Sequence, residues 1–205
     1  MKLWNSLPAD GRFHEYCIHC GHETIERVHE DGKTFFYCRT CGRQNERRVV
    51  VDPAMNSWVD DDGVYWHESA GVFVRNPENE FLFFKRVIFP VYAFTVPSGH
   101  VDTGETAEQC AVRELREESG LAAPQIKHIA SYYIAGDSCR RGSDHHRWHA
   151  YLVVLGSPAG VTLEREEGEG AEWLTLEKAK TKNLTYPVRY IIDRHAGDLE
   201  QGGPT

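Results

Sequence analysis

The sequence predicts an α+β protein in two parts, a small cysteine-rich module followed by a larger domain of strands and helices. Two Cys-x2-Cys pairs lie early in the chain, five strand-like runs follow, and two helical patterns interrupt them. A chain of 205 residues exceeds one typical domain, which favours a core domain with a small appendage. We expect the module at residues 1–52, a linker at 53–63 and the larger domain at 64–205.

The first 52 residues carry the signature of a metal-binding module. Each Cys-x2-Cys pair is followed by a glycine, and 17 residues separate the pairs, Cys17 with Cys20 and Cys38 with Cys41. This spacing is typical of a structural zinc site, or of iron in a similar site. Two short strands joined by Asp31-Gly32 complete a resemblance to a zinc ribbon. The alternative of two disulfides is disfavoured in a chain without a secretory signal.

The linker is indicated by Pro53 and the acidic run Asp60–Asp62. After it, the strand-like runs are AGVFVRN, EFLFFKR, IKHIASYYIA, WHAYLVVL and AEWLTL. Near the C-terminus, TYPVRYIIDRHAG predicts an amphipathic helix with Pro187 in its first turn and Gly197 at its end.

Charge is distributed unevenly along the chain, whose net charge is −8. Residues 1–52 carry eight Lys and Arg against eight Asp and Glu, so the excess of acid lies in the larger domain. A basic footprint for duplex nucleic acid is absent. No segment approaches the ~20 apolar residues of a membrane span, and the first residues lack the apolar run of a signal peptide. We therefore expect a cytoplasmic protein with no membrane partner.

The second helical pattern lies in GHVDTGETAEQCAVRELREESGL, residues 99–121, and is unusually acidic. Thr106 and Gln109 form a potential capping box, and Gly120 supplies a stop. On a helical wheel, Glu114, Glu117 and Glu118 share one face. Carboxylates so arranged repel one another, and Mg²⁺ or Mn²⁺ would relieve this while accepting water and phosphate oxygens as further ligands. The alternative is a solvated acidic helix face.

This stretch resembles the Nudix box, G-x5-E-x7-R-E-U-x-E-E-x-G-U, in which U is a bulky aliphatic residue. Every specified position is filled, by Gly99, Glu105, Arg113, Glu114, Leu115, Glu117, Glu118, Gly120 and Leu121. The flanking runs also resemble a Nudix domain, although Ser98 stands where the family commonly has glycine. The resemblance implies an α/β/α sandwich with a mixed sheet and metal-dependent hydrolysis of a phosphoanhydride.

The resemblance also implies roles for individual residues. The metal ligands would be Glu114, Glu117 and Glu118, with Gly99 contributing to the same site. Arg113 would orient the ligands, and Glu105 would fix the loop and the helix. A further ligand or general base often comes from the loop before the late strand. There we name Glu172, with Glu166, Glu167 and Glu169 as competitors.

The substrate class is expected to be a nucleoside diphosphate linked to another moiety, with NADH, ADP-ribose and nucleotide sugars unresolved. A zinc ribbon before a Nudix domain is the architecture of the NADH pyrophosphatase branch, but its SQPWPFPxS signature is missing after the box. Arg86, at a strand end, could contact phosphate, and Trp148 could stack on a base. The alternatives without a function are that Arg86 is a solvated surface residue and that Trp148 belongs to the core.

Five further histidines and cysteines are not specified by these motifs. We interpret His145, His146 and His149 first as a polar edge between a loop and a strand, then as substrate contacts, and only third as a metal site. The remaining cysteines, Cys110 and Cys139, are interpreted as small buried hydrophobes.

A second function class competes with the enzyme. The Nudix-like domain could sense a nucleotide without turnover while the ribbon recognises a partner. Four thiolates form a closed shell around zinc, so we expect the ribbon to be structural rather than catalytic, and it could support a homodimer.

Overall fold

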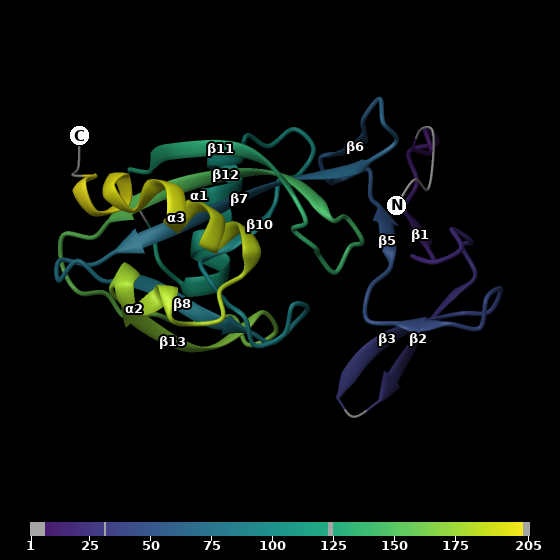
Figure 1. The fold of residues 1–205 in the computed structure, drawn as a ribbon, viewed down its shortest axis with the longest axis horizontal. Coiled ribbons are helices and arrows are strands. Elements are labelled where there is room, and N and C mark those ends of the chain that lie inside the picture. The colour runs from purple at the N-terminus through teal and green to yellow at the C-terminus, as the bar shows by residue number, and fades with distance from the viewer. Residues whose placement is uncertain (1–6, 31, 123–124, 203–205) are drawn as a thin grey trace.

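The computed structural model describes residues 7–30, 32–122 and 125–202. Figure 1 shows the N-terminal part, in purple and blue, at one end of a larger part that carries all the labelled helices. No helix in these ranges is long and apolar enough to span a membrane.

The N-terminal part contains two small antiparallel sheets. The two-stranded sheet pairs β1 (His14–Tyr16) with β5 (Val49–Val51), and the three-stranded sheet has the order β2 (Ile25–Glu30), β3 (Lys33–Cys38), β4 (Gln44–Asn45). The predicted hairpin is therefore confirmed as β2 and β3. Gly32 adopts φ +75°, a conformation that favours glycine, while Asp31 lies outside the described residues.

The larger part is built on an eight-stranded mixed sheet. Its main path has the order β11 (Lys127–Ala135), β12 (His145–Val154), β7 (Tyr65–Arg75), β8 (Phe81–Arg86), β13 (Gly168–Leu174). Two further strands pair with β7, namely β6 (Ser57–Val59) and β10 (Ser98–His100), and β9 (Phe94–Thr95) pairs with β8. Only β12 and β7 pair in parallel among these strands. Since β6 lies within residues 53–63, the segment predicted as a linker contributes to the sheet.

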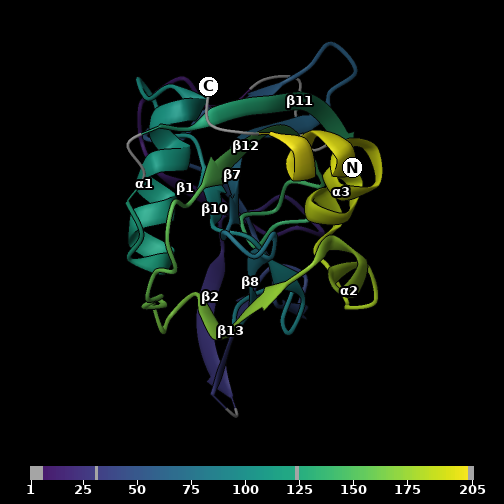
Figure 2. The ribbon, with the colours of Figure 1, turned by 90° about the vertical axis from the view of Figure 1, so that its left-hand side faces the viewer.

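Helices cover both faces of this sheet. Figure 2 shows α1 (Ala107–Ser119) on one side and α2 (Leu176–Lys180) with α3 (Tyr186–Gln201) on the other. The alternation of side chains along β7 explains the arrangement, because Val72 and Val74 pack in the core beneath α1 whereas Phe73 packs in the core beneath α3. The predicted α/β/α sandwich with a mixed sheet is confirmed.

The observed ends of α1 and α3 can be compared with the ends that the sequence predicts. Thr106 and Gln109 form the predicted capping box, and Gly120 caps α1 in the left-handed conformation at φ +69°. The prediction that the C-terminal helix ends at Gly197 was wrong, because α3 continues to Gln201 after a kink at His195. Leu199 lies beyond the glycine and is fully buried, so core packing extends the helix.

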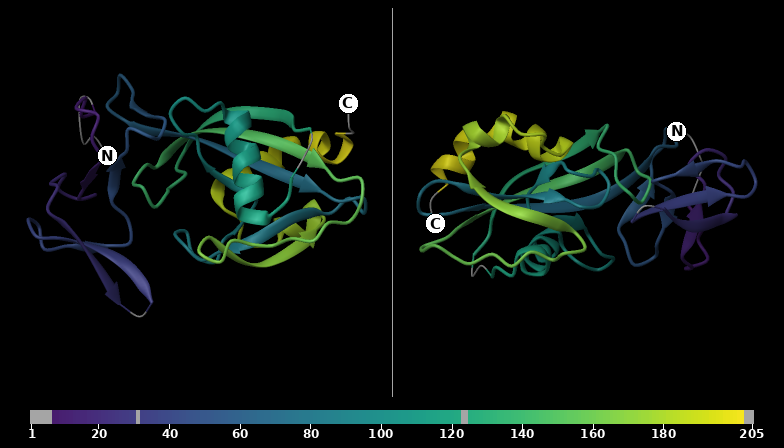
Figure 3. Two further views of the ribbon diagram at one scale, coloured as in Figure 1. Left: turned by 180° about the vertical axis from the view of Figure 1, so that it is seen from behind. Right: turned by 90° about the horizontal axis from the view of Figure 1, so that it is seen from below.

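The two parts are joined by specific contacts as well as by the chain. The Arg47 guanidinium donates hydrogen bonds to the carbonyl of Cys139 (2.8 Å), the carbonyl of Ser143 (2.9 Å) and Asp144 Oδ1 (2.7 Å). Both views in Figure 3 show the N-terminal part against the same end of the sandwich. The loop between β11 and β12 is thereby fixed to the module.

Candidate functional site

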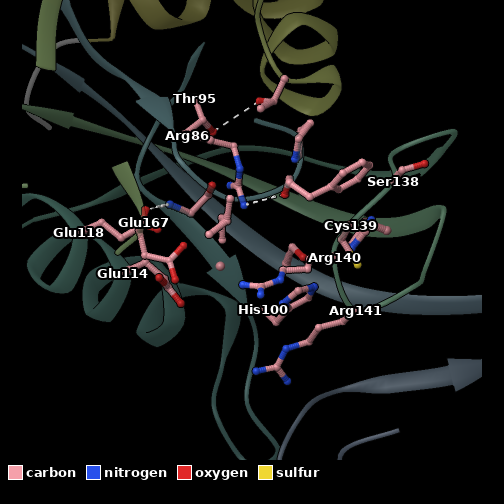
Figure 4. A pocket seen from close by; sticks show the side chains of 18 of the residues that line it. Arg86, Thr95, His100, Glu114, Glu118, Ser138, Cys139, Arg140, Arg141 and Glu167 are labelled. Carbon is pink, nitrogen blue, oxygen red and sulfur yellow. Dashed lines mark hydrogen bonds between the residues drawn. The ribbon is translucent and has the colours of Figure 1, made fainter. Parts of the chain in front are cut away.

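A cleft of about 800 Å³ lies where the two parts meet. Its wall includes residues from β2 and β3 of the module, from α1, and from the loop between β11 and β12. Six arginines line it: Arg27, Arg48, Arg86, Arg113, Arg140 and Arg141. Figure 4 shows Glu114, Glu118 and Glu167 on one side of this space and Cys139 and Arg141 on the other. A cleft with carboxylates on one wall and guanidinium groups around them can hold both cations and an anionic ligand.

The acidic face of α1 forms one wall of the cleft. Glu118 is 6% exposed, and its Oε2 accepts a hydrogen bond from the backbone N–H of Ser98 at 2.8 Å. The side chain of Glu114 is 12% exposed and that of Glu117 is 51% exposed. The helix thus presents two enclosed carboxylates and one that reaches toward solvent.

Arg113 links the helix to the loop before it. Its Nε and Nη2 donate to the two carboxylate oxygens of Glu105 at 3.0 and 2.9 Å. Its Nη1 donates to Glu114 at 2.6 Å and to Glu117 at 3.3 Å, and its Nη2 also reaches the carbonyl of His100 at 3.1 Å. One guanidinium therefore fixes the positions of three of the predicted site residues.

Gly99 leaves the space that Glu114 occupies. A Cβ atom added at this glycine would overlap the carboxylate of Glu114. The residue type at this position is therefore determined by the close approach of a side chain from α1, since only glycine leaves enough room.

The enclosed carboxylates have perturbed acidities. Burial raises the pKa of Glu118 to about 8, and the nearby charge of Glu114 acts in the same direction. Burial also raises the pKa of Glu114, although Arg113 opposes the shift. A buried and a half-buried carboxyl group whose pKa values are both raised mark a place where an added cation would be stabilised.

The chemistry of these donors fits a hard divalent cation. Oxygen ligands on one helix face suit Mg²⁺ or Mn²⁺, which retain waters and bind substrate oxygens in the remaining positions. The glutamates do not converge as tightly as the cysteines of the module, whose four sulfur atoms lie within 4.8 Å of one another. A site that shares its metal with water and substrate does not need such convergence.

In the late part of the chain, the carboxylate that lines the cleft is Glu167, in the turn before β13 (Gly168–Leu174), rather than Glu172 within the strand. Glu172 does not line the cleft, and it pairs with Lys182 Nζ at 2.9 Å. A bulge between Glu169 and Glu172 changes which residues of β13 face inward, and it cannot be read from the sequence. Glu167 lines the cleft instead, and burial raises its pKa. We therefore propose Glu167, rather than Glu172, as the further metal ligand or general base.

The two residues proposed to contact substrate, Arg86 and Trp148, differ in their surroundings. Arg86 lines the cleft, and its Nε is buried without a hydrogen-bond partner among the described residues. An unpaired buried donor beside a cleft fits an anion that completes its hydrogen bonding. Trp148 also reaches the cleft wall, but it is only 3% exposed and packs in the core against Gly71, as the alternative of a core tryptophan predicts.

The four cysteines of the module form a compact cluster. The Sγ atoms of Cys17 and Cys41 lie 3.7 Å apart, and those of Cys20 and Cys38 lie 3.6 Å apart. All six cysteines of the chain are free thiols, so the disulfide alternative is excluded. Around a tetrahedral zinc with bonds of about 2.3 Å, sulfur atoms lie roughly 3.8 Å apart. The cluster therefore fits a zinc ion with four thiolate ligands.

The other histidines and cysteines separate in the structure. Cys110 is fully buried, as expected. His149 hydrogen-bonds to Glu68 at 2.9 Å and to Ser131 at 2.7 Å, whereas the neighbouring His146 is buried and lines the cleft. Cys139 also lines the cleft and faces His67 at 3.5 Å, so its interpretation as a buried hydrophobe was wrong. No local pattern could predict this contact, because 72 positions separate the two residues.

Comparison with known proteins identifies the family. The model of the NUDIX domain matches residues 66–194. An RNA pyrophosphohydrolase of Edwardsiella ictaluri is 36% identical over 151 residues, 65% of this chain and 77% of that protein. An ADP-ribose pyrophosphatase of Methanocaldococcus jannaschii is 36% identical over 81 residues, 38% of this chain and 47% of that protein.

Solved structures share the fold. The NUDIX domain of Shewanella oneidensis NrtR complexed with ADP ribose matches with a TM-score of 0.57 and 16% identity, over 65% of this chain and 88% of that one. At this identity the likeness concerns the fold alone. With the family model covering more than half of the residues and the box at the wall of the cleft, the chain belongs to the Nudix family.

Proposed function

We propose that the chain hydrolyses the pyrophosphate bond of a nucleoside diphosphate linked to another moiety, using Mg²⁺ or Mn²⁺. The family relationship supports an enzyme that acts on phosphoric anhydrides. The observation that carries the proposal is the pair formed by the half-buried Glu114 and the buried Glu118, which face a cleft lined by arginines. Carboxylates and guanidinium groups in one cleft are what a metal-bound pyrophosphate requires.

The residues that would hold the metal are Glu114, Glu117 and Glu118. When bound, Mg²⁺ or Mn²⁺ supplies positive charge to the phosphate oxygens and lowers the pKa of a coordinated water. Arg113 keeps Glu114 and Glu117 in place through the hydrogen bonds described above. Glu105 holds Arg113 in turn.

Other residues of the cleft would act on the substrate and the water. The unpaired Nε of Arg86 can donate to a phosphate oxygen, and Arg140 and Arg141 face the same space. Glu167 can accept a proton from the attacking water, because burial raises its pKa and makes it a stronger base. The chain thus contains groups for positioning, for charge stabilisation and for proton transfer.

Among substrates, ADP-ribose, NADH and nucleotide sugars all contain the required pyrophosphate. A second candidate is an RNA that carries a terminal pyrophosphate bond, which is favoured by similarity to proteins named RNA pyrophosphohydrolases. The cleft volume of about 800 Å³ is within the ordinary range for a nucleotide-sized ligand.

A substrate panel with matched variants tests the proposal. Zinc-loaded protein is incubated with ADP-ribose, NADH, nucleotide sugars, dinucleoside polyphosphates and RNA with a terminal pyrophosphate, each with Mg²⁺ or Mn²⁺. Products are separated by chromatography. Glu118→Gln removes a proposed metal ligand, whereas Glu108→Gln removes the same charge from an exposed position in the first turn of α1, away from the cleft.

We expect turnover of at least one compound, a loss of at least about 100-fold in Glu118→Gln, and wild-type turnover in Glu108→Gln. Binding of a nucleotide without any turnover would contradict the proposal and favour a sensing protein. Preference for RNA over the small compounds would favour the second candidate.

A further inference from the structure

A second group of side chains that could hold a metal lies at the cleft wall, which three of its four members line, apart from the glutamates of α1. Its members come from β7, β10, the loop between β11 and β12, and β12 itself. They are His67, His100, Cys139 and His146, which we call the Cys-His cluster. Each offers one ligand atom, and these atoms all lie within 4.8 Å of one another. Figure 4 shows Cys139 and His100 together on the side of the cleft away from Glu118.

The separations within the cluster match the edges of a tetrahedral zinc site. Nδ1 of His67 lies 3.2 Å from Nε2 of His100 and 3.5 Å from Sγ of Cys139. With Zn–N bonds of about 2.05 Å and Zn–S bonds of about 2.3 Å, a tetrahedron places two nitrogens roughly 3.4 Å apart and a nitrogen and a sulfur roughly 3.6 Å apart. These two separations agree with a tetrahedron about as closely as the two sulfur separations of the module do, 3.7 and 3.6 Å.

The surroundings of His146 orient its ring toward the cluster. Its Nδ1 lies 3.0 Å from the carbonyl oxygen of Asp137 and 3.1 Å from Oδ2 of the same residue. A proton on Nδ1 satisfies these acceptors and leaves the lone pair of Nε2 available. Histidines that ligate metals are commonly held in this way by a carboxylate or a carbonyl.

The three imidazoles converge closely around the thiol. The ring centroid of His67 lies 4.9 Å from that of His100 and 5.4 Å from that of His146, and those of His100 and His146 lie 5.6 Å apart. One thiol and three imidazoles brought together in this way form a donor set that zinc accepts.

We propose that the Cys-His cluster binds a second structural zinc ion. One thiolate and three imidazoles suit zinc and exclude Mg²⁺, which prefers oxygen ligands. Four protein ligands form a closed shell, so this metal is not a site for water activation. It fastens the loop that carries Arg140 and Arg141 to the sandwich and holds His100, the neighbour of Gly99, beside the cleft.

Metal content and X-ray absorption of the purified full-length protein test the proposal without any variant. We expect about two zinc ions per chain, one in each cluster. The zinc absorption edge should report about five sulfur and three nitrogen neighbours over the two ions, because the module supplies four sulfurs and the Cys-His cluster supplies one sulfur and three nitrogens. One zinc per chain with sulfur ligands alone would overturn the proposal.

Two adjacent histidines of β12 provide matched variants. His146→Gln removes a ligand, whereas His145→Gln changes the next residue, which is not in the cluster. We expect His146→Gln to lose about half of its zinc and His145→Gln to lose none. In the spectrum of His146→Gln, the nitrogen neighbours should disappear while the signal of the four sulfur ligands remains. Equal zinc in both folded variants would refute the second site. If His146→Gln fails to fold, the wild-type spectrum decides. Hydrolytic activity enters neither readout, so the test is independent of the proposed function.

Discussion

At the scale of single residues, the site depends on close approaches that leave no room for alternatives. Gly99→Ala places a methyl group where the carboxylate of Glu114 lies, and Glu114 cannot move freely because Arg113 holds it at 2.6 Å. We expect turnover to fall by about 10- to 100-fold, since a displacement of about 1 Å at a catalytic group has effects of this size. Steady-state kinetics on the substrate identified by the panel measure it.

Gly156→Ala is the control for this substitution. A Cβ at Gly156 meets nothing within 4 Å, and its φ lies outside the left-handed region. We expect wild-type kinetics from it. Equal activity of the two variants would mean that Glu114 needs no fixed position.

The acidity of Glu118 predicts how stability depends on pH when Mg²⁺ and Mn²⁺ are absent. Its folded-state pKa of about 8 is above the usual 4.5, so the folded chain holds a proton that the unfolded chain has already released. The contribution to the free energy of unfolding is therefore fully present below about pH 4.5 and is lost as the pH rises to about 8. Urea unfolding across this range should show a smaller decrease for Glu118→Gln than for wild type.

Added Mn²⁺ provides an independent check at pH 8. It should raise the Tm of the wild type more than that of Glu118→Gln, because a cation that binds only the folded chain stabilises it. Glu108→Gln should behave as wild type in both experiments. Identical pH dependence in all three proteins would show that Glu118 ionises normally.

The sequence predicted those site residues that are close in the chain. Glu114, Glu117 and Glu118 lie within one turn or so of a helix, and a fixed geometry of 3.6 residues per turn makes their shared face predictable. Glu167 could not be distinguished from Glu166 and Glu169 by a periodic pattern, because it lies in the turn before β13 rather than within a strand. The Cys-His cluster could not be predicted either, because sheet topology brings together residues as far apart as His67 and His146.

At the scale of elements, α1 is the support for the site, and its N-terminus is fixed locally. The Thr106 side chain accepts a hydrogen bond from the backbone N–H of Gln109 at 3.2 Å, and the Gln109 side chain accepts one from the backbone of Thr106 at 2.9 Å. Thr106→Ala should lower the free energy of unfolding by about 1 kcal/mol, the usual cost of a lost cap.

Thr106→Ser keeps a hydroxyl oxygen at the same place and should retain most of this stability. Chemical denaturation of both variants measures the difference. If alanine and serine proved equally stable, the cap would contribute nothing, and the helix would be held by the burial of residues such as Leu115 alone.

Strand existence could be predicted better than strand arrangement. The runs that form β7 and β12 are rich in alternating or continuous apolar residues, which is a local property. Their parallel pairing, across about eighty residues of sequence, depends on how the whole sheet closes. The short β6 in the predicted linker has only three residues, too few for a periodic pattern.

At the scale of the whole molecule, the cleft belongs to both parts of the chain. The hairpin of β2 and β3 contributes Arg27, Thr34 and Phe36 to its wall, and Arg47 ties the module to the loop that contains Cys139. We therefore expect the module to influence substrate binding, with the zinc proposed for its four cysteines in a structural role. Removal of that zinc should lower affinity for substrate and also unfold the module.

Arg27 tests this link because its side chain is 58% exposed and pairs with Glu15 at 3.1 Å, on the module side of the cleft. It lies on a different element from the glutamates of α1, so we expect Arg27→Ala to raise KM about tenfold and to leave kcat nearly unchanged. Arg43→Ala is the matched control, since Arg43 is an exposed arginine of the same module that does not line the cleft. Kinetics at several salt concentrations distinguish a local contact of Arg27 with the substrate from a general electrostatic attraction between the substrate and the module. Added salt would weaken a general attraction in both variants. Equal KM values for Arg27→Ala, Arg43→Ala and the wild type would show that the module contributes no charge to substrate binding.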